Sequence, residues 1–239
     1  MTDTKKFQKA LGHLNELIKL FPKGWMYYFQ RGVAHRKLGN YDAAIADYTK
    51  AIEINPNDAE AYYNRGIDYY NLKNYDAAIA DYTKAIEINP NLSQAYNNRG
   101  IAYKDLKNYD AAIADYTKAI EINPNYADAY NNRGDAYYNL KNYDAAISDF
   151  TKAIEINPNL SVAYGNRELA RKKKREAEQS RSTTSKVTDS KQGKRRSHSR
   201  RIDTLDIPFG YYHDSDNGLV WDDDGECMPA AYYDKDFDF

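Results

Sequence analysis

A carboxamide side chain recurs along the chain at one fixed spacing. Five positions, each 34 residues from the next, carry it: Gln30, Asn64, Asn98, Asn132 and Asn166. Each carboxamide offers a donor and an acceptor, so one side chain can pair with both the N–H and the C=O of a peptide backbone. The row predicts a surface that holds an extended chain without reading its side chains, at about 0.5 to 1.5 kcal/mol for each contact. The alternative is that asparagine recurs only because the unit around it was copied.

Residues that could carry out catalysis do not come together in the sequence. The four histidines lie in different contexts and Cys227 is the only cysteine, so no nucleophile is paired with a general base. The acidic run from Asp214 to Glu226 does not have the ligand spacing of a calcium loop. We therefore expect a protein that is not an enzyme and that has no cofactor or metal.

The carboxamides belong to a repeated unit of 34 residues. The stretch YDAAIADYTKAIEINPN runs from Tyr41 to Asn57, recurs unchanged twice and returns a fourth time with two changes. The Asn just before each copy can cap a helix, an Asp lies in the first turn of that helix, and a Pro ends it. The capping residues are Asn40, Asn74, Asn108 and Asn142. Self-similarity at this period predicts stacked antiparallel helix pairs, which form a solenoid and present surfaces. The predicted full units are residues 25–58, 59–92, 93–126 and 127–160.

The residues at fixed places in the unit resemble those of the tetratricopeptide repeat family. In the second unit they are Tyr62, Gly66, Tyr69, Ala78, Tyr82, Ala85 and Pro90, and the third and fourth units match them apart from Phe150. The first unit departs from this pattern at His35. The resemblance implies an all-α fold, a right-handed tetratricopeptide solenoid of helix-turn-helix units, followed by a disordered basic linker and an acidic aromatic C-terminal tail.

Incomplete units flank the four full ones. Residues 1–24 are predicted to form an N-terminal half-repeat, whose single helix caps the stack and stops at Pro22. Residues 161–178 begin a fifth unit, but Glu168 occupies the place of the repeat glycine and no second helix follows. This segment is polar on nearly all sides, which favours a solvent-facing capping helix.

The resemblance also implies which residues line the concave groove, because the first helices of such units face it. Counted from the first residue of each unit, the carboxamides are at position 6. Position 5 holds Phe29, Tyr63, Asn97 and Asn131, position 9 holds Val33, Ile67, Ile101 and Asp135, and position 12 holds Arg36, Tyr70, Lys104 and Tyr138. This groove would be aromatic and basic at its N-terminal end, apolar midway and acidic toward Asp135, which would orient a ligand. Drift after duplication would produce the same pattern.

Two further comparisons concern the ligand of this groove. The carboxamide row is similar to the asparagine ladder in the repeat domain of O-linked N-acetylglucosamine transferases. The lysines and arginine of the two-carboxylate clamp in chaperone-binding members are missing, since Phe29 and Val33 are followed by Gln94 and Asn98.

An arginine precedes the glycine in every unit, and an aspartate lies in every second helix. The pairs are Arg31 and Asp47, Arg65 and Asp81, Arg99 and Asp115, and Arg133 and Asp149. We expect a partly buried ion pair within a unit or between neighbouring units. The alternative is that each arginine extends to solvent.

The sequence after the repeats divides into blocks of opposite charge. Residues 171–201 hold 13 Lys/Arg against three Asp/Glu, whereas residues 202–239 hold one Lys against 11 Asp/Glu. Residues 179–201 lack aromatic residues, which predicts a disordered basic linker. Residues 202–239 interleave acidic and aromatic residues, and the stretch DSDNG could turn a small hairpin. Such a tail is expected to dock on a partner, or within the chain on its own groove or basic segment.

Taken together, these features predict a non-catalytic scaffold that binds an extended segment of a partner protein. The single cysteine fits a reducing cytosol, and neither a signal peptide nor a transmembrane run is present, so we expect a cytoplasmic location. The alternative is a polyanion adaptor that binds RNA, DNA or an acidic membrane through residues 171–201 and is inhibited by its own acidic tail.

Overall fold

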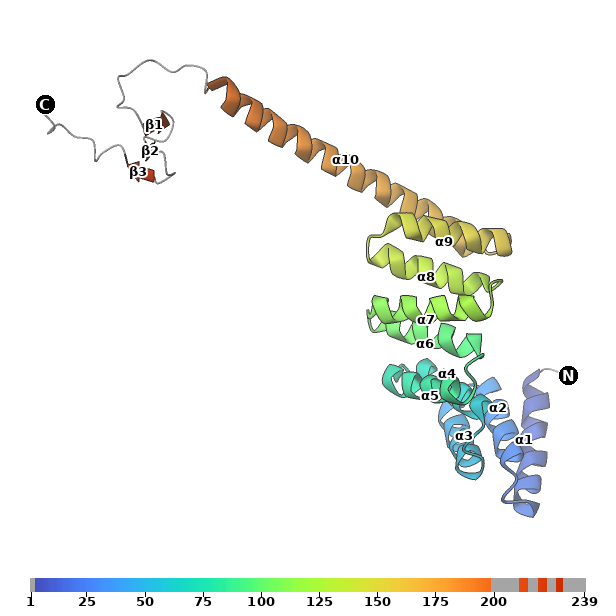
Figure 1. Cartoon of the computed structure of the whole chain (residues 1–239). Helices are drawn as coiled ribbons and strands as arrows, with labels where there is room; N and C mark the ends of the chain where they lie inside the picture. The colour runs from blue at the N-terminus through green and yellow to red at the C-terminus, as the bar shows by residue number, and fades with distance from the viewer. Residues whose placement is uncertain (1–2, 199–210, 215–218, 223–226, 230–239) are drawn as a thin grey trace, which may run out of the picture. The chain divides into compact units, whose positions relative to one another are not determined.

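The computed structural model describes residues 3–198, 211–214, 219–222 and 227–229, and the side chains of residues 4–179. The chain forms two compact units, Met1–Ser180 and Arg181–Phe239. Helices of the first unit follow one another as antiparallel pairs, from α1 in blue to α9 in yellow (Figure 1). Their bounds are α1 Asp3–Leu20, α2 Trp25–Lys37, α3 Tyr41–Ile54, α4 Ala59–Asn71, α5 Tyr75–Ile88, α6 Ser93–Asp105, α7 Tyr109–Ile122, α8 Ala127–Asn139 and α9 Tyr143–Ile156.

Asparagine side chains begin the second helix in three of the four repeats. The Oδ1 atoms of Asn74, Asn108 and Asn142 each accept a hydrogen bond of 3.3 Å from the backbone N–H three residues further on. Asn40 stands at the same place in the first repeat but makes no such bond, so the predicted cap is wrong there. Each second helix ends two residues before a proline, which cannot continue it.

Within each repeat the two helices approach closely because one residue has no side chain. A Cβ atom on Gly66 would lie 2.8 Å from Cε1 of Tyr82, and the equivalent glycines of the other repeats face the equivalent aromatic rings at similar distances. These rings are fully buried, and they belong to Tyr48, Tyr82, Tyr116 and Phe150. A glycine of the first helix therefore packs directly against a buried aromatic ring of the second helix.

The predicted ion pair is confirmed in all four repeats. Nε and Nη2 of Arg65 donate to the two carboxylate oxygens of Asp81, both at 2.8 Å, and the side chains are 16% and 8% exposed. Nη1 of the same arginine donates to Thr49 of the preceding repeat at 2.9 Å. The equivalent bonds at Arg99 and Arg133 repeat this arrangement. Each arginine therefore joins the helices of its own repeat to the previous repeat.

The last helix extends further than the sequence predicts. Helix α10 runs from Ser161 to His198, whereas the sequence predicted that order fades near Gln179 and that a disordered linker follows. The segment lacks proline and contains many Lys and Arg residues, whose helix propensity allows a helix already begun in the repeats to continue. Residues 199–201 of that linker lie outside the described residues.

Three short strands lie in the second unit. They are β1 Tyr211–Asp214, β2 Leu219–Asp222 and β3 Cys227–Pro229, and they form an antiparallel sheet in that order. The pairing of β1 with β2 confirms the predicted hairpin. The all-α prediction therefore holds for the repeats, while this sheet adds β-structure to the tail. The remainder of the predicted acidic aromatic tail lies outside the described residues.

Candidate peptide-binding groove

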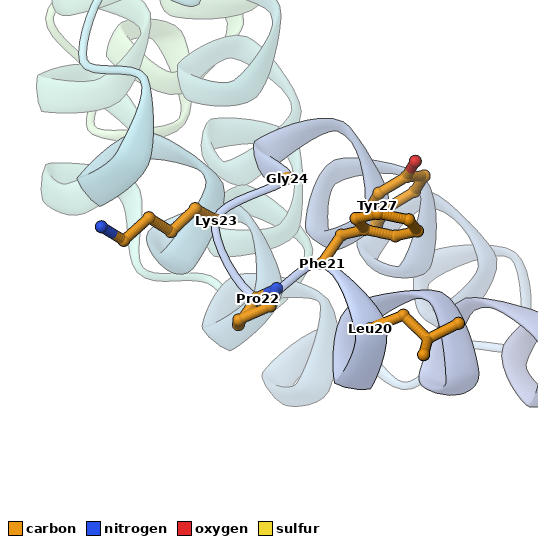
Figure 2. A pocket seen from close by; sticks show the side chains of 6 residues that line it. All are labelled: Leu20, Phe21, Pro22, Lys23, Gly24 and Tyr27. Carbon is orange, nitrogen blue, oxygen red and sulfur yellow. The ribbon is translucent and has the colours of Figure 1, made fainter.

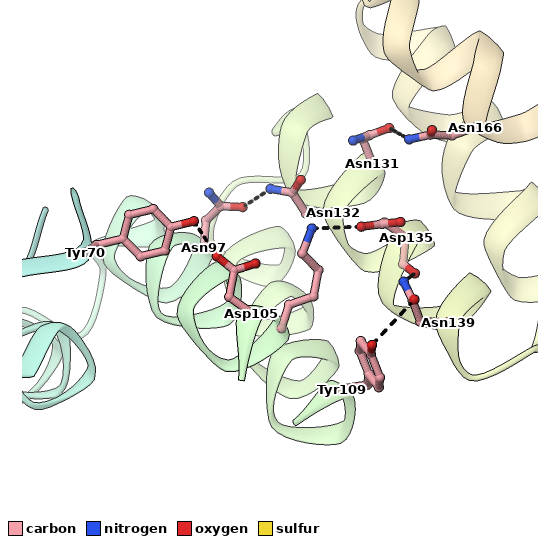
Figure 3. Close-up of polar contacts among 10 residues, drawn as sticks. Tyr70, Asn97, Asp105, Tyr109, Asn131, Asn132, Asp135, Asn139 and Asn166 are labelled. Carbon is pink, nitrogen blue, oxygen red and sulfur yellow. Dashed lines mark hydrogen bonds and ion pairs between the residues drawn. The ribbon is translucent and has the colours of Figure 1, made fainter. Parts of the chain in front are cut away.

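The carboxamides of the first helices bond to one another across the repeats. Nδ2 of Asn132 donates to Oδ1 of Asn97 at 3.1 Å, and Nδ2 of Asn166 donates to Oδ1 of Asn131 at 3.2 Å (Figure 3). In the same way Nδ2 of Asn98 donates to the hydroxyl of Tyr63 at 3.1 Å. Position 6 of one repeat thus reaches position 5 of the repeat before it. Three members of the predicted row, Asn98, Asn132 and Asn166, are thus each tied to the preceding repeat, and their role in holding a peptide stays a prediction.

These bonds leave part of each carboxamide free. Among the described side chains, the Oδ1 atoms of Asn132 and Asn166 accept no hydrogen bond, and each Nδ2 atom has a second hydrogen. Both residues are half-buried, which holds them in place and keeps them reachable. An acceptor and a donor therefore remain for the backbone of another chain.

The first junction between repeats differs from the later ones. Phe29 occupies position 5 there and has no acceptor, and its ring is only 8% exposed. Asn64 therefore bonds elsewhere: its Nδ2 donates to the backbone oxygen of Glu60 at 2.8 Å, and its Oδ1 accepts from Nη1 of Arg36 at 2.6 Å. Gln30 makes only a long contact, 4.0 Å from Nε2 to the sulfur of Met26.

The charged residues predicted for the groove are partly neutralised within the molecule. Nζ of Lys104 donates to Oδ2 of Asp135 at 2.8 Å, and the hydroxyl of Tyr70 donates to Oδ2 of Asp105 at 2.6 Å (Figure 3). Burial raises the pKa of Tyr70, and the hydrogen bond to Asp105 raises it further. The predicted acidic end therefore carries a compensating lysine.

The apolar residues predicted for the groove lie partly in the core. Val33 packs against the cluster around Tyr48, and Ile101 packs against the cluster around Tyr116. Asn97 is only 4% exposed, so its main role is to accept the bond from the next repeat. The half-buried residues Tyr63, Ile67 and Asn131 retain exposed surface.

One residue of this region was missed by sequence reasoning. Asp68 of α4 is fully buried, and among the described residues neither carboxylate oxygen has a hydrogen-bond partner. Burial raises the pKa of its carboxyl to about 7, an effect that the charge of Arg36 partly offsets. Its position holds alanine in the other three repeats, at Ala34, Ala102 and Ala136. That difference was visible in the sequence and would have marked the site.

A separate pocket lies at the N-terminal end of the repeats. A pocket of about 510 Å³ is lined by Leu20, Phe21, Pro22, Lys23, Gly24 and Tyr27, at the loop between α1 and α2 (Figure 2). None of the predicted groove residues lines it. In the described part of the chain no group of three His, Cys, Asp or Glu side chains is arranged to hold a metal ion. No helix of that part is long and apolar enough to cross a membrane.

Comparison with known families places the match on the repeats. The family model described as Tetratricopeptide repeat matches residues 59–92, 93–126 and 127–160, and the model described as TPR repeat matches residues 32–73. No curated protein sequence matches the chain. The two models together span residues 32–160, which is more than half of the chain.

Solved structures share the same arrangement of helices. The crystal structure of MamA is 28% identical, covers 67% of this chain and 98% of its own, and has a TM-score of 0.62. MamA 41-end from Desulfovibrio magneticus RS-1 is 23% identical, with 64% and 87% covered and a TM-score of 0.61. YrrB, described as a TPR protein with an unusual peptide-binding site, is 22% identical, with 70% and 86% covered and a TM-score of 0.62.

Proposed function

Because the chain belongs to the tetratricopeptide repeat family, which serves protein–protein interaction, we propose that its repeats hold an extended segment of a partner protein in their concave groove. The proposed role is that of a scaffold without catalytic activity. The residues that bind are the carboxamides at position 6, assisted by Tyr63, Ile67 and Ile101.

The observation that supports this proposal is the row of linked carboxamides. Asn98, Asn132 and Asn166 are each fixed by a bond to the previous repeat, so little conformational entropy is lost when their remaining groups bind a ligand. Each bond to a peptide backbone contributes about 0.5 to 1.5 kcal/mol. Three or four such bonds require additional apolar contact to reach micromolar affinity.

The test is selection of random twelve-residue peptides on the full chain, followed by affinity measurements on variants. We expect selected peptides to bind the Asn132→Ala, Asn166→Ala double variant about tenfold or more weakly, since two bonds of roughly 1 kcal/mol are lost. The control is Asn91→Ala, Asn125→Ala, which changes two exposed asparagines in the loops between repeats. Equal affinity for all three proteins, or a failure to select any peptide, would contradict the proposal.

A further inference from the structure

The cation at the first junction of the groove lacks an anionic partner. The arginines Arg65, Arg99 and Arg133 each hold an aspartate through two bonds, and Lys104 holds Asp135. Arg36 instead donates to the neutral carboxamide oxygen of Asn64. Among the described side chains it makes no ion pair, and it is half-buried on α2, where its guanidinium reaches Asn64 of α4.

A second carboxyl group in this region, Asp68, makes no ion pair with Arg36. It lies one helical turn beyond Asn64 on α4, and among the described residues neither of its oxygens has a hydrogen-bond partner. A fully buried, unpaired carboxylate is strongly unfavourable, so below about pH 7 this group is held as the neutral acid. Arg36 consequently keeps its charge without compensation from Asp68.

We propose that Arg36 and Asn64 form a subsite of the groove for a carboxylate group, namely the side chain of an aspartate or glutamate in the bound peptide. This inference rests on the proposed peptide-binding function. The guanidinium offers a planar fork that matches a carboxylate, and such a pair is stronger than its present bond to a neutral amide. Release of that bond also frees the Asn64 oxygen for a backbone N–H of the same ligand.

Asp68 makes the subsite dependent on pH. Three titratable or charged groups act on Asp68: Arg36 of α2, Tyr48 of α3 and Tyr82 of α5. The aspartates of α3 and α5, Asp47 and Asp81, are already paired with Arg31 and Arg65. As the pH rises through about 7, Asp68 ionises, and its negative charge partly compensates that of Arg36 without direct contact. The affinity for a carboxylate therefore falls over the same range.

The experiment uses nitrogen-15-labelled full chain and two small probes. N-acetyl-glutamate N-methylamide carries a peptide unit and one carboxylate, and N-acetyl-glutamine N-methylamide is its neutral isostere. The Arg36 Nε–H signal is identified by its absence in Arg36→Gln. At pH 6 we expect that signal to shift saturably with the acidic probe, and the affinity for the neutral probe to be about tenfold or more lower.

Three variants complete the test. Arg36→Gln should remove the difference between the probes, whereas Lys118→Gln, which takes one charge from an exposed pair on α7, should preserve it. Asp68→Ala should bind the acidic probe equally at pH 6 and pH 8, while the unaltered chain should bind it several-fold more weakly at pH 8. Identical responses to both probes, or a response that persists in Arg36→Gln, would overturn the subsite.

The outcome is separable from that of the proposed function. Peptides selected on the chain could still bind through Asn132 and Asn166 if Arg36 proves indifferent to carboxylates. In that case the subsite alone would be rejected. Peptides that bind without depending on Asn132 and Asn166, together with a positive probe response, would reject the carboxamide grip and retain an anion site.

Discussion

Asp68 shows what a single polar residue costs inside a repeat whose other copies hold alanine. Its pKa of about 7 in the folded chain is far above the ordinary value for an aspartate. The folded state therefore keeps a proton that the unfolded chain loses above pH 4. The stability from this proton is fully present below the unfolded pKa and is lost as the pH rises through about 7. Above that pH the chain must bury either a charge or an unpaired acid.

We predict that Asp68→Ala stabilises the repeats at pH 8, by about 1 to 3 kcal/mol, since an unsatisfied buried group is removed. At pH 5 the gain should be smaller, because the acid is then neutral in the folded chain. Urea unfolding followed by circular dichroism at both pH values measures this. Asp68→Asn is the matched comparison, since it removes the charge and keeps an unpaired polar group. A variant less stable than the parent at pH 8 would contradict the prediction.

At the scale of the element, the first helix of each repeat is followed by a turn residue with a left-handed backbone conformation. In the second repeat the N–H of Asn74 donates to the carbonyl of Tyr69 at 2.9 Å and the N–H of Lys73 donates to that of Tyr70 at 2.8 Å. Lys73 has a φ of 60°, and Lys107 and Lys141 match it within 1°. The first repeat has Gly39 at this place, with a φ of 77°. Glycine adopts this conformation without the steric cost that a lysine Cβ incurs.

Exchange of the two residues tests this turn in both directions. Lys107→Gly should stabilise the chain by about 0.5 to 1 kcal/mol, and Gly39→Lys should destabilise it by a similar amount. Both positions are exposed, so the exchange leaves packing unchanged. Urea unfolding of each single variant and of the double variant provides the measurement. If Lys107→Gly lowers stability, strain at the turn is not what distinguishes the repeats.

The elements were predictable from the sequence because each repeat contains its own signals. Pro56 and its counterparts mark helix ends, and Gly66 facing Tyr82 fixes the distance between two helices. The contacts between repeats were not predictable, since they depend on how one repeat is offset from the next. The bond from Arg65 to Thr49 depends on that offset. So does the bond of Asn64 to Arg36, which forms because Phe29 offers no acceptor at position 5. Of the features that the sequence analysis missed, only Asp68 could have been found, by comparing it with the alanines at the same position of the other repeats.

At the scale of the first unit, the stack stops where the fifth repeat cannot accept a second helix. In the full repeats a Cβ at the glycine position would meet the aromatic ring of the second helix at about 2.8 Å. Glu168 places a long side chain at that position, so an equivalent ring has no room. Arg167 has no aspartate 16 residues further on, and its Nε atom has no hydrogen-bond partner among the side chains of residues 4–179. Helix α10 thus covers the last repeat and prevents further stacking.

The end of the stack can be tested by two truncations of the chain. In a repeat array each unit contacts only its neighbours, so residues beyond Ser180 should not affect the repeats. We predict that a chain ending at Ser180 unfolds in urea with a free energy within about 0.5 kcal/mol of the full chain.

A chain ending at Leu160 loses Ala163 and Ala170 of α10, and Ala170 packs on Ala146 and Phe150. It should be less stable by about 2 kcal/mol or more, because the phenylalanine becomes exposed to water. A large loss already at Ser180 would show that the second unit supports the repeats, and no loss at Leu160 would show that α10 is not their cap.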